Sequence, residues 1–225
     1  MQFFILILLV CLLVFLYIIY FLSKDDLIII RKNVAMEFLF NTVFLTAFSS
    51  LFFSRLLYVL IHPRPVFHTM LGFLLFPYFP GLSLAGAIIG GLLFLYPYLK
   101  NKEMPYGRIM DFFSLGMLAA LSVGYLGVII LSEVSARLLA LFTLYLIGSI
   151  SMLKFLFPLF LRGRIRDGSL ALILIALVSF FSMVSWFLDN NYMKFFETEN
   201  TMLFILFCFS LSLFIFREFI NTSKK

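Results

Sequence analysis

The chain alternates between long apolar runs and short polar connections. Apolar runs of spanning length occur at about residues 3–22, 36–61, 81–99, 109–131, 135–161, 170–188 and 202–216. A helix needs about 20 apolar residues to cross the roughly 30 Å hydrocarbon core of a bilayer. The pattern therefore predicts an all-α polytopic membrane protein with seven transmembrane helices, forming a single integral membrane domain over residues 1–225.

One apolar stretch does not fit this pattern. Residues 66–80, between the second and third runs, are too short and too often interrupted by proline to cross a bilayer, so we expect an interfacial arm or a re-entrant piece. Composition agrees with a membrane protein, because 64% of the residues are hydrophobic and 12% are charged, against about 25% charged in soluble chains. The first run lacks a basic leader and a small-x-small cleavage site, so we expect a retained helix.

Lys and Arg gather in the connections on one side of the predicted bundle. Twelve follow the first, third, fifth and seventh helices, whereas Arg64, Arg137 and Lys194 are the three on the other side. Connections rich in Lys and Arg stay in the cytoplasm, so the N-terminus is predicted outside and the C-terminus inside. Membrane topology therefore accounts for the basic residues behind the net charge of +6. Since the basic residues form no single face, we expect no nucleic-acid partner.

Small residues gather at the start of the third helix, in FPGLSLAGAIIGG at residues 79–91. Gly86 and Gly90 form a small-xxx-small seam that allows another helix or a lipid chain to approach closely. Gly124 and Gly127 are expected to do the same on the fourth helix. This interpretation requires no catalysis.

Three charged residues are candidates for chemistry or for structural pairing. Arg55 lies several residues inside the second helix, where an arginine costs about 2.5 kcal/mol or more. It is suited to hold a phosphate through its planar fork; alternatively, it snorkels or pairs with Glu37 or Glu133. Glu133 itself either accepts a hydrogen bond from a substrate or pairs with Arg137. Asp111 is most simply an acidic helix start at the interface.

The only histidines, His62 and His68, flank a Pro-Arg-Pro turn on the predicted outer side. Together with Glu133 they are the candidates for catalytic groups, and the alternative is that both are solvated at the interface. Two histidines without Cys or carboxylate at ligand spacing make a poor metal site. We therefore expect no metal and no cofactor, and the sequence contains no nucleotide-binding or metalloprotease motif.

Taken in order, several segments resemble the prolipoprotein diacylglyceryl transferase family. Arg55 and Tyr58 match the family's G-x-R-x-x-Y-V-L, and residues 80–90 resemble its G-G-M-S-F-H-G-G-L-I-G. Residues 110–133 resemble its D-x-x-A segment, which runs into G-R-x-G-N-F-x-N-G-E. Residues 166–187 match its penultimate helix more weakly. The resemblance covers about residues 32–190, and that family is likewise described by seven helices with the N-terminus outside.

The resemblance implies a reaction and a location. The family transfers the diacylglyceryl group of phosphatidylglycerol to the lipobox cysteine of a preprolipoprotein, which is recognised through its signal peptide, in the bacterial inner (cytoplasmic) membrane. It also implies a set of substrate- and lipid-binding residues in this chain: Arg55, Tyr58, Ser83, Gly86, Gly124, Tyr125 and Gly127.

The chain departs from the family at positions that carry charge or polarity. Ala85 stands where the family has its histidine, Tyr125 where it has the arginine of G-R-x-G-N, and Val128 where it has the following asparagine. By the weaker match, Ser182 and Trp186 replace an arginine and a glutamate. Such a transfer needs an activated thiolate and cations for the leaving phosphate.

Two functions therefore stay open. One is a transferase whose base is His62 or His68 and whose phosphate clamp is Arg55, Arg64 or Arg137. The other is a divergent, catalytically lapsed relative that acts as a lipid- or lipoprotein-binding scaffold.

Overall fold

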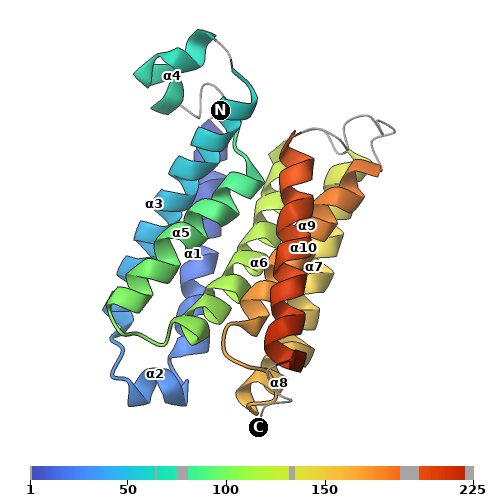
Figure 1. Cartoon of the computed structure of the whole chain (residues 1–225). Coiled ribbons are helices and arrows are strands. Elements are labelled where there is room, and N and C mark those ends of the chain that lie inside the picture. Colours follow the sequence, from blue (N-terminus) through green and yellow to red (C-terminus); the bar gives the residue numbers. More distant parts are fainter. Residues whose placement is uncertain (1, 64, 75–80, 132–134, 188–197, 221–225) are drawn as a thin grey trace.

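The fold is a bundle of long helices with a short helical arm at one end (Figure 1). The computed structural model describes residues 2–63, 65–74, 81–131, 135–187 and 198–220, and every regular element within these ranges is a helix. The long helices are α1 (Gln2–Ser23), α3 (Met36–Ile61), α5 (Leu84–Asn101), α6 (Tyr106–Leu131), α7 (Ala136–Ser151), α9 (Ser169–Phe187) and α10 (Thr198–Ile215). The short elements are α2 (Leu27–Arg31), η1 (Pro65–His68), α4 (Met70–Leu74), η2 (Met152–Leu156), α8 (Phe157–Leu161) and η4 (Phe216–Ile220).

Within the described residues, six helical stretches are long and apolar enough to cross a membrane. They are Ile5–Ser23, Met36–Ile61, Leu84–Asn101, Tyr106–Leu131, Ala136–Leu161 and Thr198–Glu218. The apolar part of α9, Ser169–Ser185, is shorter. The prediction of an all-helical, multi-pass membrane protein is confirmed, while the count of seven spans and their orientation stay predictions.

Helix boundaries differ from the predicted ones where polar residues begin a helix. α3 has the predicted bounds, but α5 begins at Leu84 because Ser83 caps it, its side chain accepting a hydrogen bond from the Gly86 amide at 3.3 Å. α10 begins at Thr198, so that Glu199 lies in its first turn, where a negative charge is favourable. These starts differ by three and four residues from the predicted starts at residues 81 and 202.

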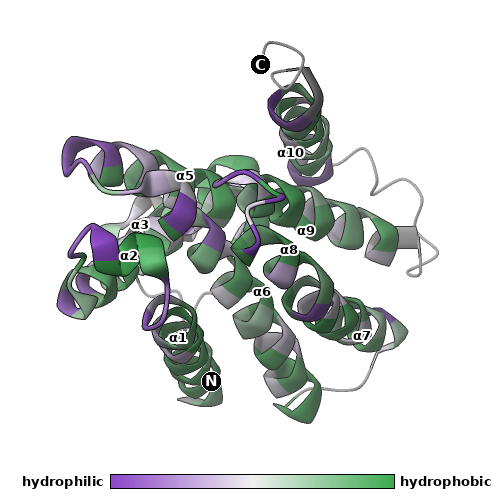
Figure 2. Cartoon of the chain, turned by 90° about the horizontal axis from the view of Figure 1, so that it is seen from below, coloured by the Kyte–Doolittle hydropathy of each residue, from purple (hydrophilic) through white to green (hydrophobic). Residues whose placement is uncertain are grey.

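In the view along the bundle, α6 runs from the middle outward between α1 and α7 (Figure 2). It packs against α1 on one side and against α7 and α9 on the other. Glycines permit the close approach of α1: a Cβ on Gly124 would lie 3.2 Å from the sulfur of Cys11, and one on Gly127 would lie 3.0 Å from Ile7. These two predicted small-residue positions therefore face a helix.

α3 and α5 form the second close pair. A Cβ on Gly86 would lie 2.7 Å from the carbonyl oxygen of Phe53, and one on Gly90 would overlap the Phe53 side chain. The same approach lets the Ser49 hydroxyl donate to the Gly90 carbonyl at 2.9 Å. The seam predicted at Gly86 and Gly90 is confirmed, and the partner that fills it is α3.

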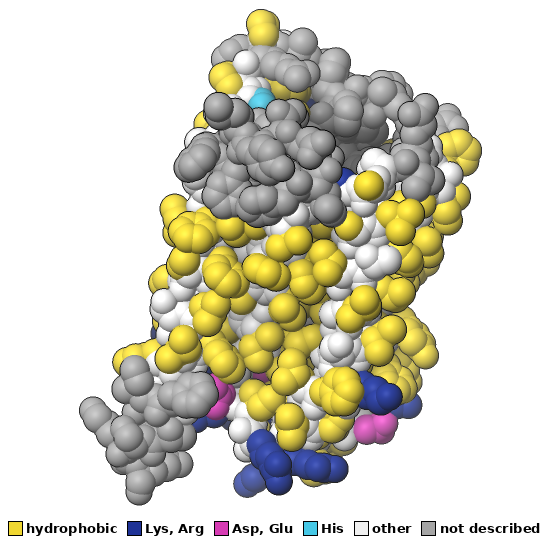
Figure 3. Space-filling model, turned by 90° about the vertical axis from the view of Figure 1, so that its right-hand side faces the viewer, with side chains coloured by type: hydrophobic (Ala, Val, Ile, Leu, Met, Phe, Trp, Pro, Cys, Tyr) yellow, Lys and Arg dark blue, Asp and Glu magenta, His cyan; other side chains and the backbone are white. Residues whose placement is uncertain are grey.

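The two ends of the bundle differ in character. We call the end that carries η1 and α4 the arm end, and the other the opposite end. Figure 3 shows an apolar zone over the middle of one face, with Lys and Arg side chains gathered at the opposite end. This matches the end to which the sequence assigns most of the basic residues.

Arg108 connects three segments at the opposite end. It donates to one oxygen of Asp26 from two nitrogens, at 3.0 and 2.6 Å, and to Asp167 at 3.0 Å. Its guanidinium also lies 3.9 Å from the centroid of the Phe160 ring. Arg108 and Asp26 are both buried. Buried charges are stable only when paired and hydrogen-bonded, so this contact fixes how the turn after α1, α6 and the connection before α9 meet.

Asp111 has a different role from the one predicted. It lies inside α6, which begins at Tyr106, and it is fully buried. Its two carboxylate oxygens accept hydrogen bonds from the amides of Gly168 at 2.6 Å and Ala171 at 2.9 Å. The prediction of an interfacial helix start is wrong, because the carboxylate instead satisfies free amides at the start of α9.

This role of Asp111 can be tested by unfolding. In Asp111→Ala, two buried amides lose their acceptor, and each unsatisfied buried group costs about 1–3 kcal/mol. In Asp111→Asn, one acceptor oxygen remains, so we expect a smaller loss. The measurement is the unfolding temperature of the purified protein in detergent.

The matched control is Ser114→Ala. The Ser114 hydroxyl bonds the Asp111 carbonyl of its own helix at 2.7 Å, so its removal should shift the unfolding temperature little. Equal shifts for Asp111→Ala and Ser114→Ala would contradict the capping role.

Candidate functional site

Arg55 attaches the arm to α3. Its side chain is 3% exposed, and it donates to the carbonyl oxygens of Phe73 at 3.0 Å, Gly81 at 2.8 Å and Gly72 at 2.9 Å. The guanidinium also lies 4.8 Å from the centroid of the Phe67 ring. A buried arginine inside a span requires partners of this kind. Among the described residues, the hydrogen-bond partners of Arg55 are thus backbone carbonyls.

Tyr58 and His62 continue the same face of α3. Their rings stack with centroids 4.8 Å apart. Gly81 lies directly against the Tyr58 ring with a φ of 150°, so a side chain there would be strained and would overlap the ring. Within the described residues, Nδ1 of His62 is buried and has no hydrogen-bond partner.

The start of α5 is held from two sides. On one side, the Ser54 hydroxyl donates to the Ser83 carbonyl at 2.7 Å, and the Ser83 amide donates to the Ser54 carbonyl at 3.2 Å. On the other, the carboxylate of Glu199 accepts a hydrogen bond from the Leu84 amide at 3.0 Å. Ala85 follows and is fully buried. The first turn of α5 therefore joins α3 to α10.

A group of hydroxyl-bearing side chains lies between α6, α7 and α9. We call Tyr125, Tyr145 and Ser182 the hydroxyl cluster. The rings of Tyr125 and Tyr145 stack with centroids 5.3 Å apart, and the Tyr145 hydroxyl lies 3.2 Å from that of Ser182. Tyr145 is fully buried. Two charged residues also lie at this end of the bundle, Arg137 in the first turn of α7 and Glu199 in the first turn of α10.

These contacts bring several predicted site residues to one end of the bundle. The Gly81 carbonyl accepts a hydrogen bond from Arg55, Ser83 caps α5, and Glu199 binds the start of α5, while Tyr125 lies two turns before the end of α6. Among the predicted residues, the arm end therefore holds Arg55, Tyr58, His62, Ser83 and Tyr125.

The remaining predicted residues divide into two groups. Gly86, Gly124 and Gly127 face neighbouring helices, as described above. Arg64, Glu133 and the side chains of His68 and Trp186 lie outside the part of the chain that the structure describes.

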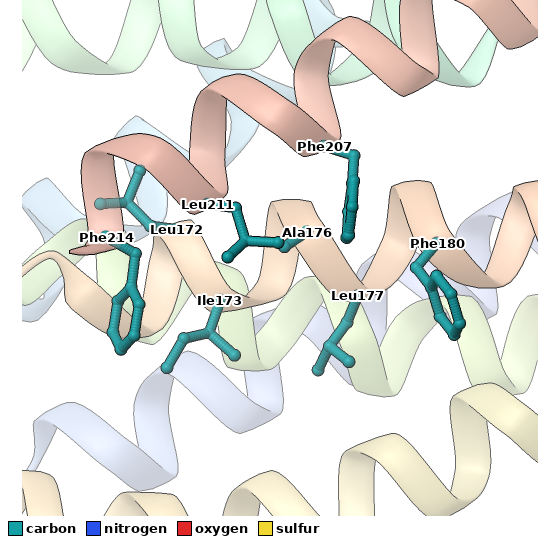
Figure 4. Close-up of a pocket in the computed structure, with 8 residues that line it drawn as sticks. All are labelled: Leu172, Ile173, Ala176, Leu177, Phe180, Phe207, Leu211 and Phe214. Atoms are coloured by element: carbon teal, nitrogen blue, oxygen red, sulfur yellow. The ribbon is translucent and has the colours of Figure 1, made fainter. Parts of the chain in front are cut away.

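An apolar groove lies elsewhere, between α9 and α10 (Figure 4). It has a volume of about 390 Å³, and it is lined by Leu172, Ile173, Ala176, Leu177, Phe180, Phe207, Leu211 and Phe214. All eight residues are apolar, so the groove can hold hydrocarbon but offers no side chain for acid–base or phosphate chemistry.

The family model described as prolipoprotein diacylglyceryl transferase matches residues 1–224. The chain belongs to this family. The match extends the resemblance beyond residues 32–190 to almost the whole chain, including the first helix. No curated protein and no solved structure matches the chain.

Membership of the diacylglyceryl transferase family gives the hydroxyl cluster its significance. By the sequence resemblance, Tyr125 stands where the family has an arginine and Ala85 where it has a histidine. By the weaker match to the family's penultimate helix, Ser182 stands where it has a further arginine. The structure places Tyr125 and Ser182 on either side of Tyr145. Tyr125 and Ser182, which are distant in sequence, thus both contact Tyr145, and both have neutral side chains.

Two residues of this end were missed by sequence reasoning. Tyr145 lies in an apolar helix, and its pattern is that of any core aromatic. Glu199 precedes the predicted start of the last helix and was therefore assigned to a connection. The signal that was available is the Thr-Glu-Asn sequence at residues 198–200, since an acidic residue is favoured in the first turn of a helix.

We expect Arg55→Lys to loosen the arm. A lysine ammonium cannot reproduce the planar fork that serves three carbonyls. Loss of a hydrogen bond to a charged group costs about 1.5–3 kcal/mol, so amide exchange at Gly72 and Phe73 should become about 10- to 100-fold faster. Hydrogen–deuterium exchange measured by mass spectrometry reports this change.

Arg162→Lys is the matched control, because Arg162 is exposed at the opposite end. It should leave exchange in the arm unchanged. If Arg55→Lys also left it unchanged, the three carbonyl contacts would not be what holds the arm.

Proposed function

We propose that this member of the diacylglyceryl transferase family binds phospholipid at its arm end and has lost the transfer reaction. The observation that carries the proposal is the neutral character of the positions where the family has its histidine and two arginines. Ala85, Tyr145 and Ser182 are buried, and Tyr125 stacks on Tyr145.

The family's reaction makes demands that neutral side chains meet poorly. The attacking thiol has an ordinary pKa near 8.5, so a base or a cationic field must help to form the thiolate. Negative charge develops on the departing glycerol phosphate, and loss of a single stabilising donor costs about 10²–10³ in rate. Tyrosine and serine hydroxyls can donate hydrogen bonds, but they do not neutralise this charge.

In this proposal, Arg55 does not bind the leaving phosphate in place of the family's two arginines. Three of its N–H groups already bind the carbonyls of Gly72, Phe73 and Gly81. Binding a phosphate through those groups would release the arm and leave a buried, strongly polar side chain to be satisfied in another way.

Lipid binding is supported by the parts of the family pattern that remain. Arg55, Tyr58 and Ser83 keep the residue types of the family motifs, and they lie at the arm end. The distribution of Lys and Arg assigns this end to the outside of the bacterial inner membrane. The expected ligand is phospholipid, with phosphatidylglycerol as the family's donor lipid and preprolipoprotein signal peptides as further candidates.

An active transferase is the second candidate. The observation in its favour is His62, whose Nδ1 is buried and without a partner among the described residues. In this alternative, His62 accepts the thiol proton, while Arg137, in the first turn of α7, binds the leaving phosphate.

The deciding experiment is mass spectrometry of a lipobox-cysteine peptide incubated with the purified protein and phosphatidylglycerol in nanodiscs. An authentic transferase of the family is the positive control. We expect no diacylglyceryl mass gain, with a rate at least about 10³ below that control, and phospholipid retained by the purified protein in native mass spectrometry.

The outcome that supports the second candidate is equally specific. A diacylglyceryl mass gain that disappears in His62→Gln, but persists in His68→Gln, would establish transfer with His62 as the base. The proposal of a lapsed enzyme would then be wrong.

A further inference from the structure

We propose that Glu199 is a specificity-determining residue that disfavours anionic lipid headgroups at the arm end and so favours net-neutral, zwitterionic phospholipids. This inference rests on the proposed lipid binding. It differs from the family's donor lipid, because phosphatidylglycerol carries a net negative charge.

The first step of the argument is where the carboxylate lies. Glu199 belongs to the first turn of α10, yet its Oε1 accepts a hydrogen bond from the Leu84 amide, 3.0 Å away in the first turn of α5. The side chain is half-buried, between the two helices. It thus reaches out of its own helix to the residue that precedes Ala85.

The second step is electrostatic. The first amides of a helix carry partial positive charge and form a favourable place for an anion. Here a side chain of the protein provides that anion. A lipid phosphate approaching the start of α5 would meet a negative charge there and would find the Leu84 amide already occupied.

The third step concerns the neighbouring charges. Arg137 lies in the first turn of α7, and Glu199 lies in the first turn of α10 and binds the Leu84 amide, so the arm end carries one positive and one negative side chain. Tyr125 itself stands where the family has an arginine. Tyr125 is neutral where the family has a cation, and Glu199 adds a negative charge at the start of α5. The arm end therefore attracts a headgroup with a net negative charge less strongly.

The chemistry that fits this arrangement is a phosphate paired with an amine. In a zwitterionic headgroup such as phosphatidylethanolamine, the ammonium is attracted to the Glu199 carboxylate. Phosphatidylglycerol offers only hydroxyl groups at the same position. Glu199 therefore discriminates by charge, not by shape.

The test compares lipids bound to the full-length, delipidated protein in native mass spectrometry, after addition of an equal mixture of phosphatidylethanolamine and phosphatidylglycerol. Glu199→Gln is the main variant, because its amide oxygen still accepts the Leu84 hydrogen bond while the charge is removed. Glu199→Asp keeps the charge. Glu37→Gln removes the same charge from an exposed position at the opposite end.

We expect the wild-type protein to retain more phosphatidylethanolamine than phosphatidylglycerol. Glu199→Gln should shift the ratio of the two lipids toward phosphatidylglycerol by about twofold to fivefold, the range expected for one charge at a helix N-terminus. Glu199→Asp and Glu37→Gln should keep the wild-type ratio.

Three results would overturn the inference. If Glu199→Gln kept the wild-type ratio while lipid was bound, Glu199 would have no role in selection, and the proposed lipid binding would stand. If Glu199→Asp shifted the ratio as much as Glu199→Gln, shape and not charge would be responsible. If neither the wild-type protein nor any variant retained lipid, the proposed function would fail, and the inference with it.

Discussion

Apolar side chains gain little free energy by leaving lipid, so helices in a bilayer must associate through close packing and polar contacts. This constraint accounts for most of the structure. Gly86 and Gly90 let α5 approach α3, and Gly124 and Gly127 let α1 approach α6. At the opposite end, Arg108 and Asp111 supply the polar contacts that fix the connections. α6 takes part both in the close packing at glycines and in the polar contacts, and it lies between α1 on one side and α7 and α9 on the other.

The sequence predicted the features that depend on local pattern. The bounds of α3 and the glycine seams follow from apolar run length and from residue size, which are visible along the chain. The roles of Asp111 and Arg55 could not be predicted in the same way. Their partners are backbone groups of other segments, and a backbone carbonyl or amide leaves no trace in a sequence. Glu199 was missed for the same reason, since its partner is the amide of Leu84.

Membership of the diacylglyceryl transferase family and the neutral residues Ala85, Tyr125 and Ser182 are compatible in this fold. The contacts that hold the helices together involve glycines, hydroxyl groups and backbone atoms. By the sequence resemblance, Ala85, Tyr125 and Ser182 stand at the positions of the family's histidine and two arginines. Ala85 and Ser182 are buried, and Tyr125 stacks on Tyr145, so these neutral residues are part of the packing. The packing of the bundle therefore does not depend on charged side chains at these three positions.

The manner in which Arg55 holds the arm has an evolutionary consequence. A guanidinium that binds three carbonyls recognises the path of the backbone, and every residue type offers the same carbonyl. Gly81 is required by its backbone conformation and its contact with Tyr58, and the Phe67 ring lies against the guanidinium. The other described residues of the arm can change their side chains without losing the hydrogen bonds to Arg55. The surface that the arm presents to the membrane or to another molecule can thus diversify among relatives while one buried arginine keeps it in place.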